Sequence, residues 1–192
     1  MNSKAIVIIG ASTGGPRTLR TVLGRLPFLD NTSVIVIQHM PRHINESIRK
    51  SLARVTAMKV KLAEDGDSLK EGVIYLSPGD VHTKIENNQC IRLIGGEKVN
   101  FVRPSIDVAM TSLGADPLTK AIGVILTGMG SDGVAGISYI KRLGGATIAQ
   151  NQASSVIYGM PKLAAETGDV DFILPPEKMG DKIAELVQAG KA

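Results

Sequence analysis

Three side chains that could act together in nucleophilic catalysis each follow an apolar run. Ser12 lies in "GASTGGP" after the run 5–9, His39 lies in "QHMP" after the run 34–37, and Asp132 lies in "TGMGSDG" after the run 122–126. A hydroxyl, an imidazole and a carboxylate are the nucleophile, base and orienting acid of a hydrolase. Ligands bind beyond the carboxyl ends of parallel strands, so these three groups would share one rim of a sheet.

The glycine-rich turn around Ser12 also admits a nucleotide-binding interpretation. A Walker loop needs Gly-Lys followed by Ser or Thr, and here Gly15 is followed by Pro16 and Arg17, which excludes that loop. A dinucleotide-binding turn fits poorly, because its glycines are spaced differently and no acidic residue ends the following strand. The nucleophile hypothesis needs only a tight turn, an exposed hydroxyl and a helix N-terminus behind it.

Each candidate residue also has a simpler structural role. Ser12 could cap the helix that follows it, and taken alone that role is the better supported; Asp132 could cap the next helix in the same way. His43 lies in a polar segment and is expected to be solvated. His82, at the entrance of a hairpin, could line the cleft or lie on a strand face. Only His39 directly ends an apolar, parallel-type strand, where a base would be held rigidly.

Apolar runs alternate with amphipathic stretches along the chain. The runs predict strands at 5–9, 34–37, 58–62, 73–76, 122–126, 146–149 and 170–174. Helices are predicted from Pro16, over 45–55, 105–113 and 134–143, and over 176–187. Two alternating runs around Asn87-Asn88 predict an antiparallel hairpin. The pattern predicts one α/β domain over 1–192: a doubly wound, mainly parallel sheet with helices on both faces and an inserted hairpin.

Composition excludes several classes of protein. The chain has 192 residues, 43% of them hydrophobic and 21% charged, and no apolar run approaches the roughly 18 residues of a membrane span. We therefore expect a cytoplasmic protein that does not insert into membranes. A net charge of +4 and six aromatic residues give no indication of nucleic-acid binding. The single cysteine, Cys90, excludes a disulfide framework or a cysteine-based zinc cluster, and is expected to be a buried strand thiol.

Seven stretches resemble the catalytic domain of CheB-type methylesterases, the receptor-modifying enzymes of bacterial chemotaxis. In chain order they are "GASTGGP" (10–16), "QHMP" (38–41), "AEDG" (63–66), "SPGDVH" (77–82), "RPSIDV" (103–108), "ILTGMGSDG" (125–133) and "AQNQASSVIYGMP" (149–161). They follow the order of the family over nearly the whole chain. Seven co-linear stretches are far more specific than one glycine-rich turn.

The resemblance implies hydrolysis of γ-glutamyl methyl esters on the cytoplasmic region of transmembrane chemoreceptors, and deamidation of certain receptor glutamines. It implies Ser12 as nucleophile, His39 as base and Asp132 as orienting acid. It also implies an oxyanion site made by the Met129 backbone N–H and the Thr13 hydroxyl. The Met129 side chain would then be free to fill a gap in the core. Neither a metal nor a cofactor is expected, and we expect a monomer.

Many family members carry an N-terminal receiver domain, and no such domain is expected in this chain. Without one, phosphorylation control cannot be assigned, and we expect constitutive activity. Two other hypotheses stay open: a nucleotide-binding regulatory module, and a receptor-binding domain without activity.

Specificity is harder to predict from the sequence. Arg17, Arg42 and Arg103 could meet an acidic receptor surface or could simply be solvated. Gln150 and Asn151 could form hydrogen bonds near the site or satisfy the backbone of a turn.

Overall fold

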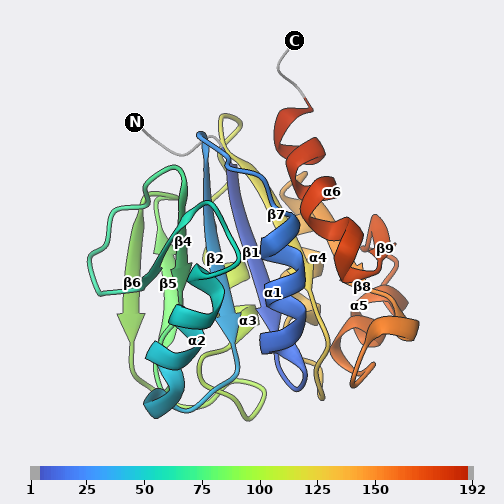
Figure 1. The fold of residues 1–192 in the computed structure, drawn as a ribbon, viewed down its shortest axis with the longest axis horizontal. Helices are drawn as coiled ribbons and strands as arrows, with labels where there is room; N and C mark the ends of the chain where they lie inside the picture. Colours follow the sequence, from blue (N-terminus) through green and yellow to red (C-terminus); the bar gives the residue numbers. More distant parts are fainter. Residues whose placement is uncertain (1–4, 190–192) are drawn as a thin grey trace.

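The computed structural model describes residues 5–189, which form two sheets and six α-helices (Figure 1). The strands are β1 (Ala5–Ala11), β2 (Thr32–Gln38), β3 (Lys59–Leu62), β4 (Val73–Leu76), β5 (His82–Glu86), β6 (Cys90–Ile94), β7 (Lys120–Ile125), β8 (Ala146–Gln150) and β9 (Phe172–Leu174). The helices are α1 (Gly15–Arg25), α2 (Asn45–Ala53), α3 (Ile106–Thr111), α4 (Val134–Arg142), α5 (Met160–Glu166) and α6 (Pro176–Gln188), with short 3-10 turns η1 (Arg42–Ile44) and η2 (Gln152–Ser154).

The main sheet has seven parallel strands in the order β3-β4-β2-β1-β7-β8-β9. Strand β1 lies at the centre; the chain then adds strands on one side of it, starting with β2, and later adds strands on the other side, starting with β7. The strand order therefore reverses between β1 and β7, and in such sheets this is where ligands bind. The predicted doubly wound, mainly parallel fold is confirmed.

Both faces of the sheet are covered, which explains why the apolar runs are continuous. Along β1, Val7 and Ile9 pack in the core beneath α1, α2 and α6. Ile6 and Ile8 point to the other face and pack with α3, α4, α5 and the β5–β6 hairpin. Figure 1 shows α1, α2 and α6 on the near side of the sheet. A strand buried on both faces has no reason to alternate polar and apolar residues.

The hairpin is present, but its cysteine is not buried. Asn87 and Asn88 form the turn between β5 and β6, both with positive φ angles (52° and 55°). Cys90 pairs with the exposed Glu86 and therefore lies on the outward face, where it is half-buried. The expected buried thiol is thus wrong. Helix α5 was also not predicted from the sequence.

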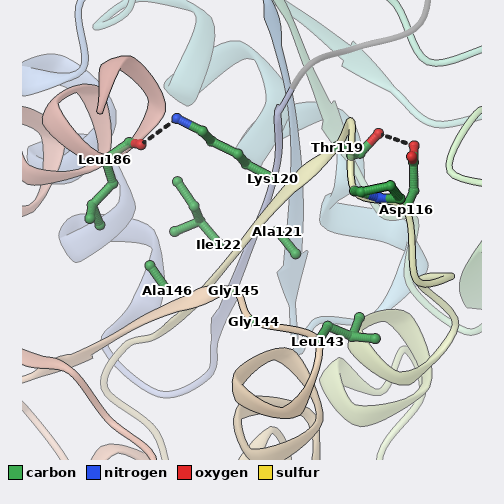
Figure 2. A pocket seen from close by; sticks show the side chains of 11 residues that line it. Asp116, Thr119, Lys120, Ala121, Ile122, Leu143, Gly144, Gly145, Ala146 and Leu186 are labelled. Carbon is green, nitrogen blue, oxygen red and sulfur yellow. Dashed lines mark hydrogen bonds between the residues drawn. The ribbon is translucent and has the colours of Figure 1, made fainter. Parts of the chain in front are cut away.

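A pocket of about 310 Å³ lies at the start of β7 and β8, at the end of the sheet opposite the carboxyl ends of these strands (Figure 2). Lys120 points across it, and its ammonium group donates hydrogen bonds to the carbonyls of Leu186, Val187 and Ala189. These carbonyls belong to the last turn of α6, where a cation also interacts favourably with the helix dipole. Lys120 is thus a helix cap. No helix within residues 5–189 is long and apolar enough to cross a membrane.

Two glycines provide a test of how closely helices approach the sheet. A Cβ atom on Gly10 of β1 would lie 2.5–2.7 Å from side-chain atoms of Ile106, whereas one on Gly24 of α1 would have 3.5 Å to its nearest neighbour. We expect Gly10→Ala to lower the free energy of unfolding by roughly 1–3 kcal/mol, because Ile106 and α3 must shift. Gly24→Ala should raise it by about 0.5–1 kcal/mol through helix propensity. Urea denaturation measures both, and equal effects would contradict the close approach of α3.

Candidate active site

Ser12 lies in the turn that joins β1 to α1. Its backbone N–H donates to the carbonyl of Thr127 (3.0 Å), and its own carbonyl accepts from Gly15 N–H (2.8 Å), which closes the turn. The N-cap of α1 is Gly14, which has a φ of 82°, and no side chain caps the helix. Ser12 is therefore not a cap, contrary to the simpler interpretation. Within residues 5–189 its Oγ atom has no hydrogen-bond partner.

The glycines of the turn allow close packing. A Cβ on Gly128 would lie 2.6 Å from Cβ of Ser12, so the β7–α4 loop lies directly against the serine. A Cβ on Gly14 would meet Val156 at 2.6 Å, and one on Gly15 would meet Gln38 Oε1 at 2.1 Å. Protein side chains thus pack against the Cβ side of these two glycines. Side chains at either position would clash, which explains the two glycines.

His39 follows β2 and is adjacent to Ser12 on the neighbouring strand. The parallel register pairs Ala11 with Gln38, and His39 N–H donates to the carbonyl of Ala11 (3.0 Å). The residues that follow this pair, Ser12 and His39, therefore lie next to each other. The imidazole Nε2 lies 2.7 Å from Oδ2 of Asp132. Since an ionised carboxylate only accepts, Nε2 carries a proton, and in the neutral imidazole the lone pair is then on Nδ1. Nδ1 has no partner in the described part of the chain.

Asp132 is 2% exposed and accepts five hydrogen bonds. The donors are His39 Nε2 (2.7 Å), Ile106 N (2.6 Å), Asp107 N (3.2 Å), Ser105 Oγ (2.7 Å) and Asn100 Nδ2 (3.0 Å). Three of these donors belong to the start of α3, while α4, which follows Asp132, has Gly133 as its N-cap and no side-chain cap. Asp132 therefore does not cap its own helix.

Burial and hydrogen bonding act on the Asp132 carboxyl in opposite directions. Burial raises its pKa, but the hydrogen bonds from His39, Ile106, Ser105 and Asn100 lower the pKa by more. The net pKa lies below the usual value of 3.8. Asp132 is therefore an anion at neutral pH and can stabilise a positively charged imidazole beside it.

The two groups expected to bind an oxyanion flank Ser12. The Met129 backbone N–H and the Thr13 hydroxyl have no hydrogen-bond partners within residues 5–189. Their loops are nevertheless fixed, because Gly128 N–H donates to the carbonyl of Ile157 (3.0 Å) and the Thr127 hydroxyl donates to the carbonyl of Thr13 (3.0 Å). Met129 is 77% exposed, so its side chain does not fill a gap in the core, which was the simpler role open to it. It projects from a short, glycine-flanked loop beside the serine.

Two histidines lie outside this cluster. His43 is exposed on η1, as expected. His82 is 3% exposed; its Nδ1 accepts from Ser105 N–H (3.1 Å) and its Nε2 donates to the carbonyl of Glu97 (2.9 Å). It supports the segment that binds Asp132 rather than lining the site.

Most of the remaining candidates have structural partners. Arg17 and Arg42 are exposed, whereas Arg103 donates to the carbonyl of Gly96. Asn151 accepts from Ser154 N–H at the start of η2.

The glutamines at the ends of β2 and β8 support the loops of the site. Gln150 accepts from Thr127 N–H (2.7 Å) and donates to the carbonyl of Ser154 (2.9 Å). Gln38 Nε2 donates to the carbonyls of both Ser12 and His39, each at 3.0 Å. Gln38 thus joins the main chains of the nucleophile and base candidates, a role that sequence reasoning missed.

Sequence reasoning also missed three residues around Asp132: Asn100, Ser105 and Asp107. Ser105 and Asp107 lie within the "RPSIDV" motif, which was a usable signal, but Asn100 lies just outside it. Within residues 5–189 no group of three His, Cys, Asp or Glu side chains could hold a metal ion.

Comparisons with known proteins agree with this fold and these motifs. A curated relative from Thermotoga maritima, named protein-glutamate methylesterase/protein-glutamine glutaminase, is 39% identical over 96% of this chain and 55% of its own length. A relative of the same name from Salmonella typhimurium is 39% identical over 100% of this chain and 56% of its own. The chain thus spans about half the length of the curated relatives it matches.

A solved structure is similar along almost its whole length. The crystal structure of the Thermotoga maritima CheB methylesterase catalytic domain matches with a TM-score of 0.88 and 39% identity, covering 94% of this chain and 97% of that one. The family model described as CheB methylesterase matches residues 7–183. On the extent of these matches, the chain belongs to the CheB methylesterase family.

Proposed function

We propose that this chain is a serine hydrolase that removes methyl groups from γ-glutamyl methyl esters of chemoreceptors, with Ser12, His39 and Asp132 as its catalytic residues. The proposal is carried by one observation: His39, paired at 2.7 Å with the buried Asp132, adjoins a serine whose hydroxyl has no partner in the described residues. A reactive hydroxyl must be free to meet a substrate. The names of the curated relatives support the choice of a glutamyl substrate.

The first half of the reaction transfers the glutamyl acyl group to Ser12. The hydroxyl oxygen attacks the ester carbonyl while His39 Nδ1 takes its proton, because Nε2 is already bonded to Asp132. The carbonyl oxygen becomes an anion, which Met129 N–H and the Thr13 hydroxyl would bind. Collapse of the tetrahedral intermediate breaks the bond to the methoxy group, and the imidazolium returns its proton so that methanol leaves.

In the second half, water replaces methanol. His39 Nδ1 takes a proton from water, whose oxygen attacks the acyl carbon, and the proton then returns to Ser12 as glutamate is released. A glutamine substrate would follow the same course with ammonia as the leaving group, which we include in the proposal. The use of Nδ1 toward serine and Nε2 toward aspartate is the reverse of the arrangement in chymotrypsin-like enzymes.

Substitution of Ser12 tests the proposal directly. We expect Ser12→Ala to lower the rate of methanol release from methylated chemoreceptor on the order of 10⁴–10⁶-fold, because the attacking atom is lost. Ser47→Ala, at an exposed serine of α2, is the matched control and should leave the rate unchanged. Substantial activity in correctly folded Ser12→Ala would remove the mechanism.

Two substitutions of Thr13 distinguish the effect of its hydroxyl on the oxyanion from the effect of its side-chain volume. We expect Thr13→Val, which keeps the volume and loses the hydroxyl, to lower kcat roughly 10²–10³-fold, because one donor to the developing anion is gone. Thr13→Ser retains the hydroxyl and should retain most of the activity. Steady-state kinetics on methylated receptor measure both variants, and equal rates would exclude a role for this hydroxyl.

The lowered pKa of Asp132 also predicts a pH-dependent stability. A carboxyl whose pKa is lower in the folded state stabilises the protein above the unfolded pKa, and this contribution is lost as the pH falls through the folded pKa. We expect Asp132→Asn to lower the free energy of unfolding by about 3 kcal/mol at pH 7, because it removes a buried charge and leaves its hydrogen-bond donors without their acceptor. The difference from the unsubstituted protein should shrink below about pH 4.

Chemical denaturation at pH 7, 5 and 3.5 measures this difference. Asp181→Asn, at an exposed carboxylate of α6, is the control and should show little effect at any pH. A difference that does not change between pH 7 and 3.5 would contradict an ionised Asp132.

A further inference from the structure

The first turn of α3 and the first turn of α4 each bind a buried carboxylate that belongs to the other helix or to a residue just before its start. Asp132 directly precedes the start of α4, and its carboxylate accepts from the N–H groups of Ile106 and Asp107 in the first turn of α3. Asp107 does the converse, because its Oδ1 accepts from Gly136 N–H (2.6 Å) in the first turn of α4. Asp107 and Asp132 are only 9% and 2% exposed. Two carboxylates are therefore held side by side under the site, one of which contacts His39.

One amide group lies between these carboxylates. Asn100 Nδ2 donates to Asp107 Oδ2 (2.8 Å) and to Asp132 Oδ1 (3.0 Å). The two hydrogens of this NH₂ group match the two acceptors. Turning the amide by 180° would direct its carbonyl oxygen at both anions, so the orientation of Asn100 is fixed.

The backbone around Asn100 is shaped to deliver this amide. Val99 and Val102 exchange hydrogen bonds across a two-residue turn, in which Asn100 and Phe101 have φ angles of 52° and 66°. Two left-handed residues are typical of a type I′ turn, and asparagine tolerates this conformation, whereas phenylalanine adopts it rarely. Phe101 is 93% exposed, so its packing does not explain the turn. The side-chain contacts of Asn100 do.

We propose that Asn100 is a positioning residue for the reaction, which holds the Asp132 carboxylate so that Oδ2 faces His39, and which is itself anchored by Asp107. The proposal rests on the proposed function of Ser12, His39 and Asp132. Within the described residues, the side-chain hydrogen bonds of Asn100 go to Asp107 and Asp132 and to neither Ser12 nor His39, so in this proposal it acts through the carboxylate.

The hydrogen bonds divide the two oxygens of Asp132 between different tasks. Oδ1 accepts from Asn100, Ser105 Oγ and Asp107 N–H, whereas Oδ2 accepts from Ile106 N–H and His39. With Oδ1 fixed on one side, the carboxylate cannot rotate away from the imidazole. Burial, and then the nearby Asp132 charge, raise the pKa of Asp107, against hydrogen bonds from Gly136 and Asn100 that lower it. A neutral double donor between two anions reduces this repulsion.

Two substitutions separate the amide from the turn. Asn100→Gly keeps the freedom to adopt a positive φ and removes the amide. Asn100→Asp keeps the shape and replaces the donor with a third carboxylate. Asn87 is the matched control, because it has the same φ of 52°, is exposed in the β5–β6 turn, and has no side-chain hydrogen bond to the described residues. The same two substitutions are made there.

The measurements are kcat and KM for methylated chemoreceptor in membrane vesicles, each as a function of pH, with the full chain. We expect Asn100→Gly to lower kcat about tenfold with little change in KM, because the base is oriented less well. Asn100→Asp should lower kcat further. Its additional negative charge beside Asp132 should also move the acid limb of kcat/KM to higher pH. Both Asn87 variants should match the unsubstituted protein.

Two outcomes would overturn the inference. In the first, the Asn100 variants have the same kcat and pH profile as the Asn87 variants. In the second, they lower only the urea midpoint while kcat and the acid limb stay unchanged, which would indicate a purely structural turn. Ser12→Ala in the same assay keeps the two proposals apart. If it is inactive while the Asn100 variants are normal, only the positioning role fails; if it is fully active, the proposed function itself fails.

Discussion

The site is organised by the cost of burying one negative charge. An ionised carboxylate in a protein interior is stable only when donors surround it, and Asp132 collects them from the end of β2, from the start of α3 and from the turn at Asn100. Each of these segments is therefore fixed relative to the others by the same anion. The imidazole of His39 is oriented as one member of this set of donors. A requirement of stability thus also arranges the groups for chemistry.

The parallel sheet supplies the second constraint. Ser12 and His39 follow adjacent strands in register, so the spacing between strands sets the separation of their main chains. Buried glutamines then hold the loops that follow. Gln38 joins the carbonyls of Ser12 and His39, and Gln150 binds the N–H of Thr127, whose carbonyl in turn accepts from Ser12. The donated and accepted hydrogen bonds of these two glutamines thus tie the loops to rigid strand ends.

The sequence predicted those parts of the fold in which a local pattern of apolar residues also determines where the segment lies in the sheet. Continuous apolar runs predicted the strands, and the residues that follow three of them are the ones the fold gathers at the strand ends. Local rules failed for the helix caps. Ser12 and Asp132 look like caps of the helices that follow them, yet Gly14 and Gly133 occupy those positions with positive φ angles. Their side chains are thereby left to take part in long-range contacts.

Long-range packing accounts for the rest of what the sequence did not predict. The exposure of Met129 depends on the path of a glycine-flanked loop, which no periodicity describes. Asn100 gains its partners only when its turn meets the start of α3 and the end of the β7–α4 loop, and no spacing in the sequence records this meeting. The family motifs pointed toward Asp107 without indicating that it and Asp132 cap each other's helices.

Lys120 brings the first and last described residues together. It pairs with Ala5 across β1 and β7, while its ammonium group binds the end of α6 at Ala189. β1 rises about 3.3 Å per residue, so Ala5 lies roughly 23 Å from Ser12, at the far end of the strand. A fluorescent label or a surface tether attached at Ala189, which is exposed, would therefore project away from the strand ends that carry Ser12 and His39. The molecule can be immobilised there with the opposite end of the sheet left open to solvent.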